Sequence, residues 1–390
     1  MQKVPARSGP GQAAADLCRS CHEPLFDRIL DLGLQPVADR LVRADAPASA
    51  DVPYPLVLVL CRSCMLLQLA RFEGEDRVRG HEDHSAISST VAAHDGAWAS
   101  ELVQRFRLGP GSLVAEAEGS GDGVTRALVA SGVRVLAAGE CTAGSADLVV
   151  ANHSLAHALD LDQAVTELLT PLAVGGTAAL EFHHGARLLT DSQFDTICHP
   201  HRTYPSVAAL VKALSRHGLD VYEATEIPVH GGSVRIYARQ GGSGTAAAVK
   251  EIVAGEAMLG LDGISRDCDL ARHVDTISTK LQAFLARARV DGRTVVGYGA
   301  PSRASTLLNY CQLTPELLPA TVDQSTAKQG WALPGCRVPI HPPSLLTEVK
   351  PAFVLILAWT LADEIMAQLS QVRSWGGRFV VPLPDLRILA

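Results

Sequence analysis

The 390-residue sequence lacks the features that mark several broad classes of protein. Acidic residues outnumber basic ones by 41 to 34, so there is no excess of positive charge for binding nucleic acid or an anionic membrane surface. No apolar run is long enough to span a membrane, and the opening MQKVPARSGPGQAAAD lacks the apolar core of a secretion signal. We therefore expect a cytoplasmic protein without nucleic-acid or membrane partners.

The nine cysteines form a pattern that suits a metal site better than a disulfide framework. Most are scattered, but four stand in two identical CRSC sequences, Cys18 with Cys21 and Cys61 with Cys64. Two CxxC pairs separated by a long loop have the spacing by which two knuckles bring four thiolates to one tetrahedral zinc ion. Because four thiolates leave no open position, we expect a structural zinc that stabilises the first part of the chain.

The first half of the sequence changes its pattern several times. Residues 1–16 are small and polar, and we expect a disordered lead there. The segment from Cys18 to about Leu69 is typical of a compact unit with two short strands in YPLVLVLCRSCMLLQLA. After a helix expected near 92–106, strand and helix signals alternate from SLVAEAEGSGDG onward. This alternation favours a parallel, doubly wound sheet.

A second α/β unit follows a break in the pattern. GGSGTAA, at 241–247, is typical of a linker, and Ser265 is the candidate N-cap of a long helix after it. RTVVGYGAPSRASTLLNYC, FVLILAW and RFVVPLP then each end a strand in a turn or a helix start. We therefore expect an α/β protein with a zinc-binding module at 17–80, a central α/β domain at 81–240, and a helical linker with a second α/β domain at 241–390.

Two glycine-containing turns are candidates for ligand binding. EGSGDG, at 118–123, follows an expected strand and opens a helix, and Glu140 ends the next strand, where a carboxylate can accept hydrogen bonds from ribose hydroxyls. Many α/β proteins carry such a turn for chain reversal alone, but the spacing to Glu140 favours a cofactor that contains a nucleoside. In GYGAPSR, at 297–303, Arg303 could reach a phosphate or carboxylate, or the segment could be a packing turn with a solvated arginine.

Together these segments resemble one family, the zinc-containing, S-adenosylmethionine (SAM)-dependent C-methyltransferases that act on nucleotide-linked keto-deoxysugars in natural-product pathways. The resemblance covers nearly the whole chain after Asp16. It rests on the CRSC pairs, GSGDG, ADLVVANHSLAH, QFDTICHPHRTY, HGGSVRIY, GYGAPSRASTLLNY, VDQSTAKQGWALPG and LILAWTLADEI. It implies a zinc-binding front, a central Rossmann domain of the methyltransferase kind, and a C-terminal Rossmann-like domain that helps to hold the sugar nucleotide.

The resemblance also implies roles for individual residues. A histidine of the family removes the proton from the carbon beside the sugar ketone, and the enolate then attacks the methyl group of SAM. His201 matches this base, with His199 as a second catalytic candidate. The cofactor residues implied are Gly119, Gly121, Asp122, Gly123, Glu140 and Asn152, and the substrate residues are His183, Tyr204, His230, Tyr298, Arg303 and Lys328. We expect a monomer or a homodimer.

The sequence departs from the family at three places. The family has a segment like Tyr-His-Glu-His where this chain has Cys198-His199-Pro200-His201, so a tyrosine and a glutamate that would assist the base are missing. At 81–89, HEDHSAISS replaces a Tyr-rich stretch of the family. Only CTAGSA, at 141–146, separates Glu140 from the strand DLVVAN, and six residues cannot contain a helical crossover. The adenine pocket should therefore lose part of its wall while Glu140 remains.

Three functions stay open at this point. The chain could be a working C-methyltransferase with rearranged details. It could instead keep the carbon-acid chemistry without SAM, as an epimerase, isomerase, dehydratase or cyclase that uses His201 or His199. It could also be a non-catalytic scaffold. His153, His157 and the EFHH segment at 181–184 are further candidates for a pocket at the strand ends.

Overall fold

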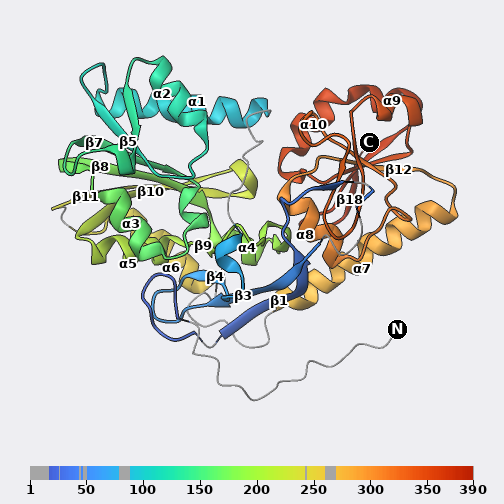
Figure 1. The fold of residues 1–390 in the computed structure, drawn as a ribbon, viewed down its shortest axis with the longest axis horizontal. Coiled ribbons are helices and arrows are strands. Elements are labelled where there is room, and N and C mark those ends of the chain that lie inside the picture. The colour runs from blue at the N-terminus through green and yellow to red at the C-terminus, as the bar shows by residue number, and fades with distance from the viewer. Residues whose placement is uncertain are drawn as a thin grey trace.

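The computed structural model describes residues 17–25, 27–43, 45–46, 51–78, 88–241, 244–259 and 269–389. The expected lead at 1–16, most of HEDHSAISS and Ser265 lie outside these residues. Two α/β units stand side by side, and the N-terminal strands run below and between them (Figure 1). Among the described helices, none is both long and apolar enough to cross a membrane.

The N-terminal strands form a small antiparallel sheet of order β1-β3-β4-β9. Three of these strands come from the cysteine-containing segment: β1 (Asp27–Pro36), β3 (Pro53–Leu60) and β4 (Leu67–Leu69). The fourth, β9 (Thr203–Tyr204), directly follows the segment that carries His201 and pairs with β4, Leu67 opposite Tyr204. The sheet therefore joins the cysteine pairs to the candidate catalytic segment. A short helix, η2 (Glu75–Arg77), closes this part of the chain.

The central sheet has the order β10-β11-β8-β7-β5-β6, in which β6, β5, β7 and β8 are parallel and β10 and β11 are antiparallel. Every residue of β7 except Asp147 is buried, as expected of a parallel strand covered on both faces. Its elements are α1 (Ser89–Phe106), β5 (Leu113–Glu116), α2 (Asp122–Ala130), β6 (Arg134–Ala137), β7 (Ala146–Asn152), η5 (Ser154–His157), α3 (Leu161–Leu169), β8 (Leu172–His183), α4 (Gly185–Thr190), η6 (Phe194–Thr196), α5 (Val207–Arg216), β10 (Leu219–Ile227), η7 (Val229–Gly231), β11 (Ser233–Gln240) and α6 (Ala247–Met258).

The sheet ends at β6, which is its edge strand. Between β6 and β7 the chain forms only the short helix η4 (Ala138–Glu140) and a turn. No described residues add a strand beyond this edge.

The C-terminal sheet has the order β15-β13-β12-β16-β17-β18, with only β18 antiparallel. A separate two-residue pair, β2 (Val42–Arg43) with β14 (Trp331–Ala332), ties it to the N-terminal segment. Its other elements are α7 (Asp269–Val290), β12 (Val295–Tyr298), α8 (Ser302–Tyr310), β13 (Thr321–Val322), β15 (Ile340–His341), α9 (Leu345–Val349), β16 (Phe353–Ile356), η8 (Trp359–Leu361), α10 (Ala362–Gln368), η9 (Ser370–Trp375), β17 (Arg378–Val381) and β18 (Arg387–Leu389).

Buried apolar side chains join the N-terminal segment to both α/β units. Leu30 and Leu58 belong to one cluster with Leu307 of the C-terminal unit, while Cys18 and Cys61 belong to another with Val207 of the central unit. The fold is therefore a mixed α/β structure with two Rossmann-like parallel sheets and a cysteine-bearing segment packed against both.

Candidate active site and zinc centre

Cys18, Cys21, Cys61 and Cys64 converge on one point. Their sulfur atoms all lie within 4.8 Å of one another, with 3.5 Å between Cys18 and Cys64 and 3.5 Å between Cys21 and Cys61. Four sulfurs at about 2.3 Å from a tetrahedral zinc ion are about 3.8 Å apart, so the cluster is close to the arrangement that binds zinc. In the described part of the chain, these cysteines are the one group of three or more His, Cys, Asp or Glu side chains that lie close enough together to hold a metal ion.

The surroundings of the cysteines also suit a cation. Gln68 and the backbone N–H of Ser20 donate hydrogen bonds to the sulfur of Cys18 at 3.2 and 3.3 Å. Hydrogen bonds from the Cys61 and Cys64 thiols lower the pKa of Cys18, whereas the hydrogen bond with Cys18 raises the pKa of Cys64. A zinc ion bound here would allow all four thiols to ionise, because a coordinating thiol is deprotonated.

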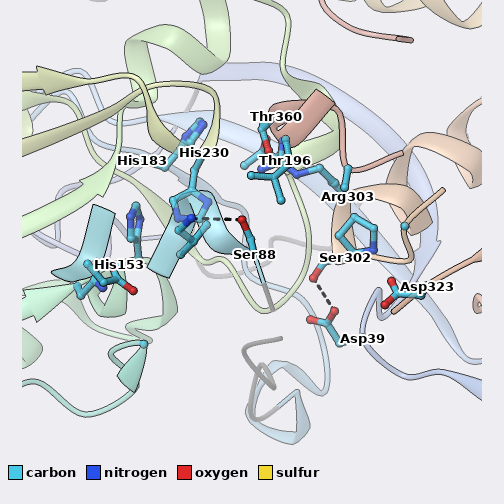
Figure 2. Close-up of a pocket in the computed structure, with 18 of the residues that line it drawn as sticks. Asp39, Ser88, His153, His183, Thr196, His230, Ser302, Arg303, Asp323 and Thr360 are labelled. Atoms are coloured by element: carbon cyan, nitrogen blue, oxygen red, sulfur yellow. Dashed lines mark hydrogen bonds between the residues drawn. The ribbon is translucent and has the colours of Figure 1, made fainter. Parts of the chain in front are cut away.

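A cavity of about 790 Å³ lies between the two α/β units. It is lined by residues that follow the carboxyl ends of β5, β7 and β8 on one side and of β12, β13 and β16 on the other. Figure 2 shows His153, His183 and His230 across the cavity from Ser302 and Asp323. Ligands of open α/β sheets bind at such strand ends, so this cavity is the candidate active site.

The first glycine turn borders this cavity. Gly119, Gly121 and Asp122 line it, and the backbone φ of Gly119 is +79°, a conformation that favours glycine. A Cβ atom on Gly119 would lie 4.0 Å from the ring of His157. Gly123 is required for another reason, because a Cβ there would lie 1.9 Å from a carboxylate oxygen of Asp95 on α1.

The other predicted cofactor residues differ in their positions. Asn152 is buried at the end of β7 and lines the cavity. Its backbone N–H donates to the hydroxyl of Ser120 at 3.2 Å, and its Oδ1 has no hydrogen-bond partner within the described part of the chain. Glu140 is exposed at the sheet edge and is not among the lining residues. The structure thus brings the glycine turn and Asn152 together but leaves Glu140 outside the cavity.

His201 lines the cavity next to His157. The two rings meet edge to face with their centres 5.1 Å apart, and Nδ1 of His157 is 3.0 Å from the carbonyl oxygen of Pro200. Since a carbonyl only accepts, this contact assigns the proton to Nδ1 and leaves Nε2 of a neutral His157 as an acceptor. Arg202 holds the segment by donating to the carbonyls of Val78 at 2.5 Å and Pro200 at 3.3 Å.

His199, the second catalytic candidate, lies elsewhere. Its side chain is fully buried between the rings of Tyr54 and Phe72, with ring centres 5.9 and 5.1 Å away, and it does not line the cavity. Among the described residues no group makes a hydrogen bond of good geometry to either ring nitrogen; burial lowers the pKa of His199 to about 4, an effect that nearby backbone groups of Pro55, Tyr54 and Pro36 partly oppose. The backbone turns at this point, with the N–H of His201 donating to the carbonyl of Cys198 at 3.0 Å, and only His201 of the pair lines the cavity.

Tyr204 also lies outside the cavity. It is 2% exposed, and its hydroxyl accepts from the backbone N–H of Cys198 at 3.1 Å and contacts the carbonyl oxygen of Cys198 at 3.4 Å. It therefore stabilises the loop that carries His201 rather than offering a group to a ligand.

The remaining predicted substrate residues all line the cavity. His183 and His230 lie on the central side, and burial lowers the pKa of both, that of His183 to about 3. On the other side the hydroxyl of Tyr298 accepts from Gln324 at 2.9 Å, and Lys328 donates to the carbonyl of Ala300 at 3.0 Å. The guanidinium of Arg303 lies over the ring of Trp359, 5.3 Å from its centre.

Several cavity residues were missed by the sequence interpretation. Asp39 accepts from the hydroxyl of Ser302 at 2.5 Å, which brings a carboxylate of the zinc-bearing segment to the cavity wall. Thr196 and Glu364 line the cavity as well. Asp39 and Glu364 reach it through long-range packing that leaves no local pattern, whereas the position of Thr196 in QFDTICHPHRTY was a usable signal.

Parts of the chain match two family models and resemble solved structures. Residues 18–78 match a family model described as "Putative zinc binding domain", and residues 228–384 match that of the C-methyltransferase C-terminal domain. Among solved structures, 1,6-didemethyltoxoflavin-N1-methyltransferase of Burkholderia thailandensis is 12% identical, covers 45% of this chain and 95% of its own, and has a TM-score of 0.30. YcgJ of Bacillus subtilis is 11% identical, covers 38% of this chain and 100% of its own, and has a TM-score of 0.29.

A longer match comes from the C-methyltransferase NovU of Streptomyces niveus. It is 30% identical over 409 residues, and the alignment covers 96% of this chain and 97% of NovU. Because this identity extends over nearly the full length of both proteins, and because the cysteine cluster and both Rossmann-like sheets are present, the chain belongs to the C-methyltransferase family.

Proposed function

We propose that this C-methyltransferase methylates a carbon next to a ketone, with His201 as the base. His201 removes the proton from that carbon, the electron pair of the broken C–H bond forms a C=C bond, and the carbonyl electrons move to the oxygen to give an enolate. SAM, when bound, supplies the electrophilic methyl group. The chain's own task is to position the ketone, take up the proton and stabilise the enolate oxygen.

One observation carries this proposal: the pair His201 and His157 borders the glycine turn at Gly119 inside a single cavity. A base and a cofactor turn must share one space if the carbanion is to reach a methyl group. The cavity volume of about 790 Å³ is within the usual range for sites that hold a cofactor and a small substrate.

The cofactor side supports one end of SAM better than the other. The N–H groups at the start of α2 and the unpartnered Oδ1 of Asn152 offer partners for a carboxylate and an ammonium group, which is the chemistry of the amino-acid end. We propose that the adenosine end lies toward β6. Glu140 would have to turn inward to contact the ribose.

For the substrate we propose a nucleotide-linked keto-deoxysugar of a natural-product pathway. Arg303 and Lys328 place two cationic side chains on the C-terminal wall of the cavity, and Lys328 uses one of its three donors within the chain. We further propose that the chain divides into functional parts near residues 80 and 240, with the pairing of β9 and β4 connecting the first two, and that it acts as a monomer or homodimer in the cytoplasm.

A second candidate function is favoured by the sheet edge. Because Glu140 is exposed and no described residues continue the sheet beyond β6, a relative that deprotonates the same carbon without SAM is chemically consistent with the site. Return of a proton to the other face of the enolate would make such an enzyme an epimerase or isomerase.

Calorimetric titration of the purified chain with SAM separates the two candidates. Binding in the micromolar range supports methyl transfer, whereas no heat at millimolar SAM would exclude it. In parallel, keto-sugar nucleotides in deuterated water should take up deuterium at the acidic carbon, and His201→Ala should abolish the exchange. If wild-type protein exchanges none of the ketones, both catalytic proposals fail and the scaffold function is favoured.

A further inference from the structure

The cavity wall formed by η6, α8 and the end of β8 contains buried polar atoms without partners. Among the described residues these are Nη1 of Arg303, Oγ1 of Thr196 and Nδ1 of His183, whose residues all line the cavity, and Oδ1 of Asp195, which does not line it. Figure 2 shows the three lining residues along one side of it, with Thr196 between His183 and Arg303 in the view. Native proteins rarely leave several buried polar atoms unpaired side by side, so the wall calls for a ligand with complementary groups.

The protonation state of His183 follows from its neighbours. The amide nitrogen of Gln193 donates to the carbonyl of Gly231 at 2.7 Å, which fixes the amide so that its oxygen faces Nε2 of His183 at 2.9 Å. That oxygen only accepts, so Nε2 carries the proton. Burial and the nearby Arg303 lower the pKa of His183 to about 3, so the ring is neutral. Its Nδ1 is therefore a hydrogen-bond acceptor that lacks a donor.

The other two groups are donors held in place by packing. Arg303 is stacked on Trp359, whose indole N–H donates to Asp195 at 2.6 Å. Thr196 follows Asp195 directly and is 5% exposed. A Cβ on Gly231 would lie 3.2 Å from Trp359, so the turn that orients Gln193 packs against the ring that supports Arg303. The acceptor and the donors thus share one rigid support.

We propose that these three side chains form a subsite for two neighbouring oxygen atoms of the substrate. Arg303 and Thr196 donate to the ketone oxygen, and Nδ1 of His183 accepts from a hydroxyl group on an adjacent carbon. When His201 takes the proton, the negative charge develops on the oxygen held by Arg303 and Thr196, which supply the stabilisation that the missing tyrosine of the catalytic segment would give. This subsite rests on the proposed function and narrows its substrate to an α-hydroxy ketone.

The subsite predicts discrimination between two ligands that differ by one hydroxyl group. A ligand without the hydroxyl leaves Nδ1 of His183 buried and unpaired, so its binding should be weaker by about 10-fold to 100-fold. The probes are a nucleoside diphosphate-linked keto-deoxysugar with a hydroxyl next to the ketone and the analogue that lacks this hydroxyl. Calorimetry measures both dissociation constants without any need for turnover.

His183→Phe should bind the two sugars equally, with the affinity for the analogue close to that of the wild type. Thr196→Val removes a donor at almost constant shape; it should keep the discrimination but slow deuterium exchange at the acidic carbon by about 10-fold or more. Thr276→Val is the matched control, because Thr276 is exposed on α7, does not line the cavity, and its hydroxyl donates only to the carbonyl of Arg272 in its own helix. Its exchange rate and its binding ratio should equal those of the wild type.

The result that overturns the subsite is equal binding of both sugars by wild-type protein, or an unchanged ratio in folded His183→Phe. Wild-type exchange rates in Thr196→Val would overturn the donor assignment even if His183→Phe does not fold. A wild type that discriminates between the sugars but exchanges no deuterium keeps the subsite and refutes the proposed reaction, so the two failures are distinguishable.

Discussion

The carboxylate of Glu364 accepts a hydrogen bond from the backbone N–H of Thr90 at 3.0 Å, and so caps the first turn of α1 from α10 of the other α/β unit. The same carboxylate accepts from the N–H of Ser89 at 3.0 Å and from the hydroxyl of Ser88 at 2.8 Å. Ser88 and Glu364 both line the cavity. This contact therefore fixes the two units relative to each other at the rim of the candidate active site.

Replacing Glu364 with glutamine should weaken this cap. We expect a loss of roughly 1 kcal/mol in the free energy of unfolding, the usual scale for a lost helix cap. Burial raises the pKa of Glu364, but the hydrogen bonds from Thr90 and Ser88 outweigh it and lower the pKa to about 2. Since the folded pKa is depressed, the stabilisation is present above the unfolded value near 4.3 and is lost as the pH falls through about 2.

Urea unfolding of wild type and Glu364→Gln at pH 7, 5, 4 and 3 measures this. The stability difference should be constant down to pH 5 and then shrink. Glu348→Gln, a change of an exposed glutamate on α9, is the matched control and should show no difference at any pH. A Glu364→Gln difference that stays the same from pH 7 to pH 3 would contradict the cap.

Removal of zinc should unfold the N-terminal sheet and disturb the catalytic segment with it. Atomic absorption should find one zinc per chain in the wild type and much less in Cys61→Ser, whereas Cys141→Ser, which changes a cysteine outside the cluster, should retain it. Because β4 pairs with β9, Cys61→Ser should also lose deuterium exchange at the substrate carbon. A Cys61→Ser protein with full zinc content would refute the site.

His199→Leu should be tolerated, in contrast to His201→Ala. The substitution removes two buried ring nitrogens without partners, so the midpoint of thermal unfolding at pH 7 should be equal or higher. Deuterium exchange should stay at the wild-type rate in His199→Leu and disappear in His201→Ala.

The pH dependence gives a further check on His199. Its pKa is lowered to about 4 in the folded state, so the unfolded chain binds a proton below about 6.5 that the folded chain does not. As the pH falls from about 6.5 to about 4, His199 should lower the free energy of unfolding of the wild type by up to about 1.4 kcal/mol per pH unit. The free energy of unfolding of His199→Leu should fall less over the same range. Identical slopes would mean that His199 is not buried as a neutral ring.

Gly123→Ala should destabilise the packing of α1 on α2. Its Cβ would lie 1.9 Å from the carboxylate of Asp95, and overpacking of this kind costs about 1–3 kcal/mol. Gly139→Ala is the control, because no atom lies within 4 Å of a Cβ at that position. Chemical denaturation of both variants measures the difference, and equal stability of the two would show that Asp95 moves aside freely.

Local patterns in the sequence account for much of the fold. The cysteine spacing predicted the four-sulfur cluster because each CxxC knuckle forms from adjacent residues. The alternation of strands and helices predicted two parallel sheets because each such strand needs a helical crossover. The same reasoning explains the short connection around Glu140, where only the helix η4 and a turn lie between β6 and β7.

Contacts between distant segments were beyond such reasoning. The pairing of β9 with β4, the approach of Asp39 to Ser302 and the cap from Glu364 to Thr90 each depend on how preformed units pack together. The sequence also could not separate His199 from His201, since the loop around Pro200 decides which ring faces the cavity. Resemblance to the family pointed to His201 as the proposed base, and the structure adds its neighbours.

The measurement that tests the central claim most directly is carbon-13 NMR after incubation with SAM labelled in its methyl group. The substrate is a nucleoside diphosphate-linked keto-deoxysugar with a hydroxyl next to the ketone, and His201→Ala is the control. The account predicts a labelled methyl group bonded to the carbon beside the ketone with wild-type protein and none with His201→Ala. Label that stays in SAM while deuterium from the solvent enters that carbon would contradict methyl transfer and establish a SAM-independent reaction.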